Sequence, residues 1–192
     1  MLDITNYLVK ERVGFMKLVD VFDIYNADTG EKIGVAIERP SGLVKALRLL
    51  INKRFMPTRV DIGPSENEPP YVSIRRGITF LRSKIMIIGK GGTSLGYFKS
   101  KLFSLGGGFF VYNDNDEQVA EIKGDWKGWN FKFLSASGEE IGLVTKKWAG
   151  IGKELFTSAD NYVISLSGEP DETRAALLLA AGIAIDTVFK EK

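Results

Sequence analysis

An unbroken apolar run near the end of the chain, AALLLAAGIAI at Ala175–Ile185, most constrains the fold. An α-helix rises about 1.5 Å per residue, so this run would span about 16 Å, roughly half of the ~30 Å hydrocarbon layer of a bilayer. Asp186 ends the run. As a helix it would be apolar on every side, so it cannot lie half exposed on a surface in water. We expect the rest of the chain to surround it.

The composition excludes most familiar catalytic sites. The 192 residues contain no cysteine and no histidine. Disulfides, thiolate nucleophiles and zinc–cysteine sites are therefore excluded, and so are Ser-His-Asp catalysis and imidazole acid–base chemistry. We expect a protein that is not an enzyme and needs no cofactor.

The charge and the first residues bear on partners and location. A net charge of +2 is too small to indicate nucleic acid as a partner, so an anionic partner would have to meet a local cluster of cations. The opening sequence MLDITNYLVKERVG has no basic segment followed by an apolar one, as a signal peptide would have. We therefore expect a cytoplasmic protein that binds no nucleic acid.

Polar turns and short apolar runs alternate along most of the chain. One design occurs at Phe22–Ala36, Phe109–Ile122 and Phe131–Val144: alternating apolar residues, a polar turn, an acid, and a second apolar segment. This pattern is typical of antiparallel hairpins. The sequence predicts a meander of β-hairpins forming one domain over residues 1–192, with Asp61–Pro70 as a long loop between strands.

Two segments break the β pattern. In Ser41–Phe55, helical spacing separates an apolar face from a polar one, which predicts a short basic amphipathic helix. The apolar face carries Leu43, Ala46, Leu47 and Leu50, and the opposite face carries Lys45, Arg48 and Asn52. The second segment is the C-terminal run, whose helix start is marked by Pro170 and by the acids Asp171 and Glu172 in the first turn.

Two strand motifs precede the C-terminal run. Glu140–Leu166, EIGLVTKKWAGIGKELFTSADNYVISL, contains an Ile-Gly-x-x-x-Lys-x-Trp strand and then a Phe-Thr-x-Ala-Asp-Asn-aromatic strand, and continues without a gap to Asp186. This arrangement resembles the phospholipid scramblase family and, more broadly, the tubby-like and LURP-one-related group. Val72–Lys84 resembles the family's Arg-Arg strand pair, and Glu11–Asn26 resembles its opening hairpin. The resemblance implies a mainly β fold, a closed antiparallel barrel of roughly twelve strands around a central hydrophobic C-terminal helix.

The resemblance also points to a calcium site proposed in scramblases. The matching residues here are Asp160, Asn161, Glu169 and Asp171, whereas Ser158 stands where the family has its first Asp. Calcium needs about 6–8 oxygen ligands in a compact loop. The central YVISL reads instead as a strand, which would hold the two ends apart. The alternative is an ordinary strand end followed by a helix start.

Basic residues form the second candidate site. Tubby domains hold phosphoinositide head groups with Lys and Arg on the barrel surface, and the resemblance extends that expectation to this chain. The candidates are Lys45, Arg48, Lys53 and Arg54 on the amphipathic helix, and Arg75, Arg76, Arg82 and Lys84 on or beside strands. Phosphate binding needs several cations at one point. Scattered, solvated charge is the alternative.

Three functional interpretations follow. The first is a barrel that binds acidic phospholipids or the membrane surface, peripherally on the inner face. The second is a protein-interaction scaffold without a ligand. The third is phospholipid translocation, which requires a spanning segment or a hydrated groove, and the sequence indicates neither. The sequence also lacks the proline-rich tail and the cysteine cluster of the animal scramblases.

Overall fold

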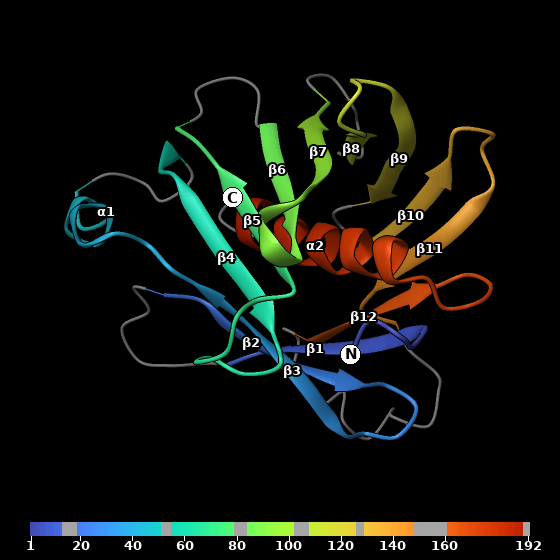
Figure 1. Ribbon diagram of the computed structural model, residues 1–192, viewed down its shortest axis with the longest axis horizontal. Helices are drawn as coiled ribbons and strands as arrows, with labels where there is room; N and C mark the ends of the chain where they lie inside the picture. Colours follow the sequence, from blue (N-terminus) through green and yellow to red (C-terminus); the bar gives the residue numbers. More distant parts are fainter. Residues whose placement is uncertain are drawn as a thin grey trace.

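The computed structural model describes residues 1–12, 19–50, 55–78, 84–101, 108–125, 129–147 and 161–189. Within these residues twelve antiparallel strands close into a barrel, each paired with its neighbours in sequence and β1 paired with β12 (Figure 1). The strands are β1 (Asn6–Glu11), β2 (Val21–Asn26), β3 (Lys32–Glu38), β4 (Thr58–Gly63), β5 (Val72–Arg76), β6 (Lys84–Gly89), β7 (Ser94–Ser100), β8 (Gly108–Tyr112), β9 (Gln118–Asp125), β10 (Asn130–Ser135), β11 (Glu140–Thr145) and β12 (Asn161–Leu166). The predicted closed barrel is confirmed.

The three predicted hairpins are confirmed as β2–β3, β8–β9 and β10–β11. In the first turn, the Asn26 side-chain oxygen accepts a hydrogen bond from the backbone N–H of Asp28 at 2.9 Å. In the second, the Asn113 side-chain oxygen accepts from the backbone N–H of Asn115 at 3.0 Å. Asparagine stabilises tight turns by such bonds to the backbone. The local sequence therefore fixes where these strands reverse.

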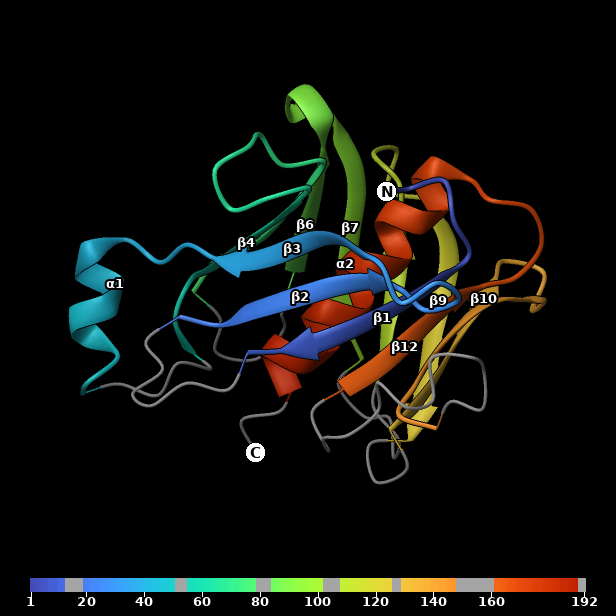
Figure 2. The same cartoon turned by 90° about the horizontal axis from the view of Figure 1, so that it is seen from below.

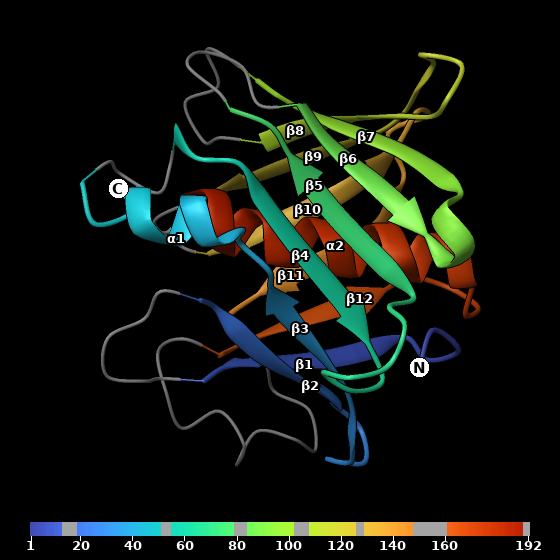
Figure 3. The same cartoon turned by 60° about the vertical axis from the view of Figure 1, so that its left-hand side comes forward.

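The apolar run forms α2 (Glu172–Phe189), which lies inside the barrel (Figures 1 and 3). Figure 3 shows β4 and β5 crossing in front of it. The Asp171 carboxylate caps the helix by accepting a hydrogen bond from the backbone N–H of Arg174 at 2.7 Å. The buried apolar residues of α2 are Ala175, Ala176, Leu178, Leu179, Ala180, Ala181, Ile183, Ala184 and Ile185. The helix is therefore the core around which the wall closes.

Small residues set the distance between α2 and the wall. A Cβ added to Gly182 would lie 2.5 Å from Cδ1 of Ile164 on β12. A Cβ added to Gly142 on β11 would lie 2.6 Å from Cδ2 of Leu178 on α2. Interiors pack as densely as organic crystals, so neither contact leaves room for a larger side chain without movement.

The antiparallel order gives the barrel two distinct ends. The odd-numbered strands and α2 all run toward the end that carries α1 (Gly42–Leu47), which we call the α1 end. The hairpin turns after β2, β8 and β10 lie at the opposite end, which we call the turn end. Figure 2 shows α1 on the left and the N-terminus to the right of it.

The segment between β3 and β5 differs in detail from the prediction. The described helix covers Gly42–Leu47, is capped by the Ser41 hydroxyl, and is followed by a turn through Leu50. Residues 51–54 lie outside the described residues. Residues 64–71 connect β4 and β5, so a long loop between strands is confirmed, although Asp61–Gly63 belongs to β4.

Candidate functional site

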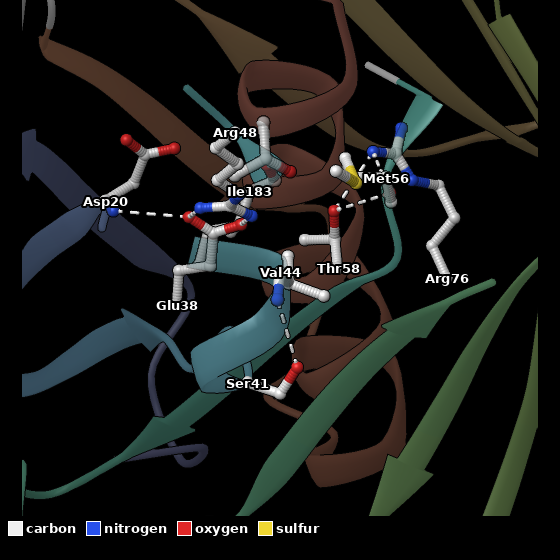
Figure 4. Close-up of polar contacts among 10 residues, drawn as sticks. Asp20, Glu38, Ser41, Val44, Arg48, Met56, Thr58, Arg76 and Ile183 are labelled. Atoms are coloured by element: carbon white, nitrogen blue, oxygen red, sulfur yellow. Dashed lines mark hydrogen bonds and ion pairs between the residues drawn. The ribbon is translucent and has the colours of Figure 1, made fainter. Parts of the chain in front are cut away.

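Arg48 points into the barrel end instead of toward solvent (Figure 4). Its guanidinium donates two hydrogen bonds to the Glu38 carboxylate, at 2.5 and 3.0 Å. The side chains of Arg48 and Glu38 are 4% and 0% exposed, and Ile183 of α2 lies beside them in Figure 4. Because Glu38 is buried, it requires a charged partner, and Arg48 supplies it. Arg48 therefore attaches the end of α1 to the barrel.

This attachment leaves the predicted apolar face of the amphipathic helix unpacked, and no residue of α1 is buried. Leu43 and Leu50, predicted to share the apolar face, are 71% and 85% exposed. Arg48, predicted on the polar face, is buried. A helical wheel separates two faces but does not determine which of them meets the protein. The buried carboxylate of Glu38 decides the orientation here.

The adjacent arginines of β5 lie on opposite sides of the barrel wall, as strand alternation requires. Arg76 faces inward and is 4% exposed. Its guanidinium donates to the Thr58 hydroxyl at 3.0 Å and to the Met56 carbonyl at 3.2 Å (Figure 4). Arg75 is exposed. Of this pair, only Arg75 is presented to solvent.

Lys45 and Lys84 are also exposed at the α1 end. The Lys84 ammonium lies 3.7 Å from the centre of the Tyr97 ring, a cation–π contact. The pKa of Tyr97 is raised to about 12, chiefly because its hydroxyl donates a hydrogen bond to Asp116. The remaining predicted cations, Lys53, Arg54 and Arg82, lie outside the described residues.

The described charges are segregated along the barrel. Exposed cations at the α1 end include Lys45, Arg75, Lys84, Lys123 and Lys147, together with Arg12, Arg39 and Arg59, which form ion pairs with acids of the protein. Exposed acids at the turn end are Asp3, Asp28, Glu31, Glu68, Asp114, Asp116, Glu117, Glu139, Glu140, Glu169 and Glu172. The turn end also carries the cations Lys32, Lys90 and Arg174. The α1 end is thus the more basic surface, and the turn end the more acidic one.

Acidic groups also occur at the α1 end. Glu38 is held by Arg48, and Glu121 forms ion pairs with Lys101 and Lys123. Burial acts to raise the pKa of Glu121, but the hydrogen bonds from the two lysines bring it below its ordinary value. Asp125 is exposed there. Glu38 and Glu121 therefore offset cations within the protein.

Sequence reasoning missed Lys123 and Lys147. Lys123 lies near the end of β9, and Lys147 follows the end of β11. Both strands are odd-numbered and therefore run toward the α1 end. Counting hairpins along the sequence would have placed both lysines at the same end of the barrel as Lys45 and Arg75.

The calcium candidates are separated by a strand. Asn161 begins β12 at the α1 end and is buried, whereas Glu169 and Asp171 follow β12 at the turn end. Asp160 lies outside the described residues. Asp171 caps α2. Among the described residues, no group of three or more acidic side chains is arranged to hold a metal ion.

A surface pocket of about 430 Å³ opens at the turn end beside the start of α2. Its lining carries charges of both signs, from Asp3, Lys90 and Glu172. The Lys90 ammonium lies 5.7 Å from the centre of the Tyr71 ring. This mixture favours neither an anionic nor a cationic ligand.

Comparison with protein families adds to this geometry. Residues 69–192, more than half of the chain, match the scramblase family. The chain belongs to the scramblase family. The predicted relationship is confirmed, and scramblase membership indicates a lipid-related function. Within the described segments, no helix has the length and hydrophobicity needed to cross a bilayer.

Relatives of this scramblase-family chain differ in how much of it they cover. Altered inheritance rate of mitochondria protein 25 of Saccharomyces cerevisiae is 22% identical across 93% of this chain and 68% of its own length. Human phospholipid scramblase 2 is 30% identical across 44% of this chain, and human phospholipid scramblase family member 5 is 28% identical across 52%. The matches span 31% and 40% of these two human proteins. No solved structure matches the chain significantly.

Proposed function

We propose that this protein binds acidic phospholipid head groups at a membrane surface through its α1 end, without catalysing a reaction. The segregation of charge carries the proposal. An anionic surface attracts the end that exposes Lys45, Arg75 and Lys84, and repels the turn end with its acidic hairpin turns. The charges therefore attract the protein to the membrane and also orient it with its α1 end facing the lipid.

The most useful cations are those with no partner inside the protein. Neither Lys45 nor Arg75 forms an ion pair with a described residue. Binding to a phosphate would therefore not require either residue to break an internal contact. Family membership and the names of the human relatives, phospholipid scramblases, support phospholipid as the ligand class. The proposed location is peripheral, on the cytoplasmic face of a membrane.

The test is cosedimentation with phosphatidylcholine vesicles that contain phosphatidylserine or a phosphoinositide, at low and physiological salt. Each cation near an anionic surface contributes about 1 kcal/mol. The double variant Lys45→Gln/Arg75→Gln should therefore bind about tenfold to thirtyfold more weakly than the wild type. Added salt should weaken vesicle binding by the wild type and reduce the difference in affinity between the wild type and the variant.

The matched control removes the same charge from the other end. Lys90→Gln/Arg174→Gln alters two cations at the turn end and should bind vesicles as the wild type does. Equal losses in both double variants would show attraction by net charge alone and would overturn the oriented site. Absence of wild-type binding to every acidic vesicle at low salt would favour a scaffold without a lipid ligand.

Phospholipid translocation is the activity named for the human relatives and needs a separate assay. The protein is reconstituted with vesicles that carry a fluorescent lipid, and a reductant that cannot cross the membrane bleaches the outer leaflet. Head-group binding alone predicts that the protected inner-leaflet fraction stays at the level of protein-free vesicles. Accelerated loss of that fraction would add translocation to surface binding.

A further inference from the structure

Large apolar side chains gather at the α1 end outside the core. Of the six large hydrophobic side chains exposed in the described part of the chain, only Val119 lies at the turn end. The other five are Leu43, Leu49, Leu50, Phe55 and Ile78, which are 71%, 75%, 85%, 41% and 70% exposed. We call these five residues the apolar rim.

The apolar rim comes from two neighbouring parts of the fold. Leu43 lies on α1, and Leu49 and Leu50 lie on the turn that follows it. Phe55 precedes β4, and Ile78 follows β5. Thr58 of β4 is paired with Arg76 of β5, so both of these segments extend beyond the same strand pair. The rim therefore occupies one side of the α1 end.

The structure holds the leucines outward. Ser41 caps α1 by accepting a hydrogen bond from the backbone N–H of Val44 at 3.3 Å, and Arg48 binds the buried Glu38 at its other end. Turning the leucines inward would remove Arg48 from Glu38 and leave a buried carboxylate without its cation. Breaking a buried pair in this way is strongly unfavourable. The exposure of the rim is thus enforced by the barrel itself.

Charge around the rim indicates what covers it. Lys45 lies between Leu43 and Leu49 in sequence, and Arg75 lies three residues before Ile78. Apolar side chains bordered by cations match the boundary between anionic head groups and acyl chains. A second copy of this chain seated on the same surface would instead bring cations against cations.

We infer that the apolar rim inserts into the acyl-chain boundary of an acidic membrane while the neighbouring cations bind head groups. This inference rests on the proposed function and adds to it how deeply the protein enters the membrane. Insertion supplies binding that salt does not screen, because apolar transfer from water does not depend on charge. The head-group contacts supply the salt-sensitive part.

The absence of cysteine permits a direct depth measurement. Leu50→Cys at the rim and Asn115→Cys in an exposed turn at the turn end are each labelled with an environment-sensitive fluorophore. On phosphatidylserine-containing vesicles the label at position 50 should shift to the blue and be quenched by lipids with brominated acyl chains. The label at position 115 should remain at its emission in water.

Substitution gives an independent readout. Leu49→Ser/Leu50→Ser removes two exposed side chains without touching the core, and Val119→Ser is the matched change at the turn end. The rim variant should bind vesicles at physiological salt at least about tenfold more weakly than the wild type. Val119→Ser should bind as the wild type does.

The outcomes separate insertion from head-group binding. Vesicle binding without a blue shift or quenching at position 50 would overturn insertion and leave the proposed function standing. No binding to any acidic vesicle at low salt would overturn both. Dimerisation would give a different set of results. Sedimentation equilibrium would show a concentration-dependent dimer that Leu49→Ser/Leu50→Ser abolishes, and the label at position 50 would shift to the blue without vesicles. These results together would assign the rim to contact with a second copy of the chain.

Discussion

Arg48, after α1, and Glu38, at the end of β3, form a two-pronged ion pair whose side chains are 4% and 0% exposed. The pair spans only ten residues of sequence, yet it fixes how the connection from β3 to β4 meets the barrel end. It directs Leu43 and Leu50 to solvent. One buried contact thus keeps the leucines of the apolar rim on the surface.

Removing one partner of this pair should be strongly destabilising. We expect Arg48→Ala to lower the free energy of unfolding by about 3–5 kcal/mol, because the buried Glu38 carboxyl would lose its cationic partner. Arg48→Met/Glu38→Leu should recover much of this loss, because no buried charge is left. Urea unfolding of the wild type and the variants measures both effects. A loss below about 1 kcal/mol in Arg48→Ala would contradict the buried pair.

The central helix makes a second prediction. Ala180 is 0% exposed at the middle of α2, so Ala180→Asp should lower the free energy of unfolding by several kcal/mol or prevent soluble expression. The control is Thr173→Asp, in the exposed first turn of the same helix, where the helix dipole favours an acid. Thermal unfolding by circular dichroism compares them. Similar stability of the two variants would place α2 on a surface.

Much of the fold follows from local sequence. Asn26 and Asn113 bond to their own turns, and those turns fix the hairpins whose repetition builds the wall. The run Ala175–Ile185 is apolar on all sides and too short to cross a bilayer, which predicts burial inside that wall. Local turn chemistry and the length of an apolar run are properties that a sequence expresses directly.

The site could be predicted only in part, because it depends on contacts between distant strands. The inward direction of Arg48 depends on the burial of Glu38, and the inward direction of Arg76 depends on Thr58 across the β4–β5 pair. Neither inward direction can be predicted from residue type or helical spacing. The separation of Asn161 from Asp171 was predictable, because the strand between them was evident in the sequence.

A glycine on β7 makes the third prediction. Gly96 has φ of 112°, and a Cβ there would lie 2.1 Å from the carbonyl oxygen of Tyr112. Gly96→Ala should therefore lower the free energy of unfolding by about 2 kcal/mol or more, through backbone strain and the clash. Gly42→Ala is the control, because no atom lies within 4 Å of its added Cβ. Chemical unfolding that ranks Gly42→Ala as the more damaging change would contradict this geometry.

The last prediction concerns acid stability and Asp23 on β2. Arg12 donates hydrogen bonds to its carboxylate at 2.7 and 2.9 Å, and the Lys32 ammonium lies 2.7 Å away. The hydrogen bonds from Arg12, followed by those from Lys32, hold the pKa of Asp23 below its ordinary value of 3.8, against the effect of burial. The folded protein thus binds fewer protons than the unfolded chain over the interval between the two pKa values. Stability from this site is complete above the unfolded pKa and is lost as pH falls through the folded one.

Asp23→Asn tests this directly. At neutral pH the variant should be less stable by about 1 kcal/mol, a modest amount because the arginine and lysine are partly exposed. Below about pH 4 the wild type loses the contribution of Asp23 while the variant has none to lose, so their unfolding free energies should converge. Glu139→Gln, at an exposed turn carboxylate, is the control for the removal of one negative charge. The contrary result would be a constant difference in unfolding free energy between Asp23→Asn and the wild type from neutral pH into acid. It would show that Asp23 titrates alike in the folded and unfolded chains, contrary to its contacts with Arg12 and Lys32.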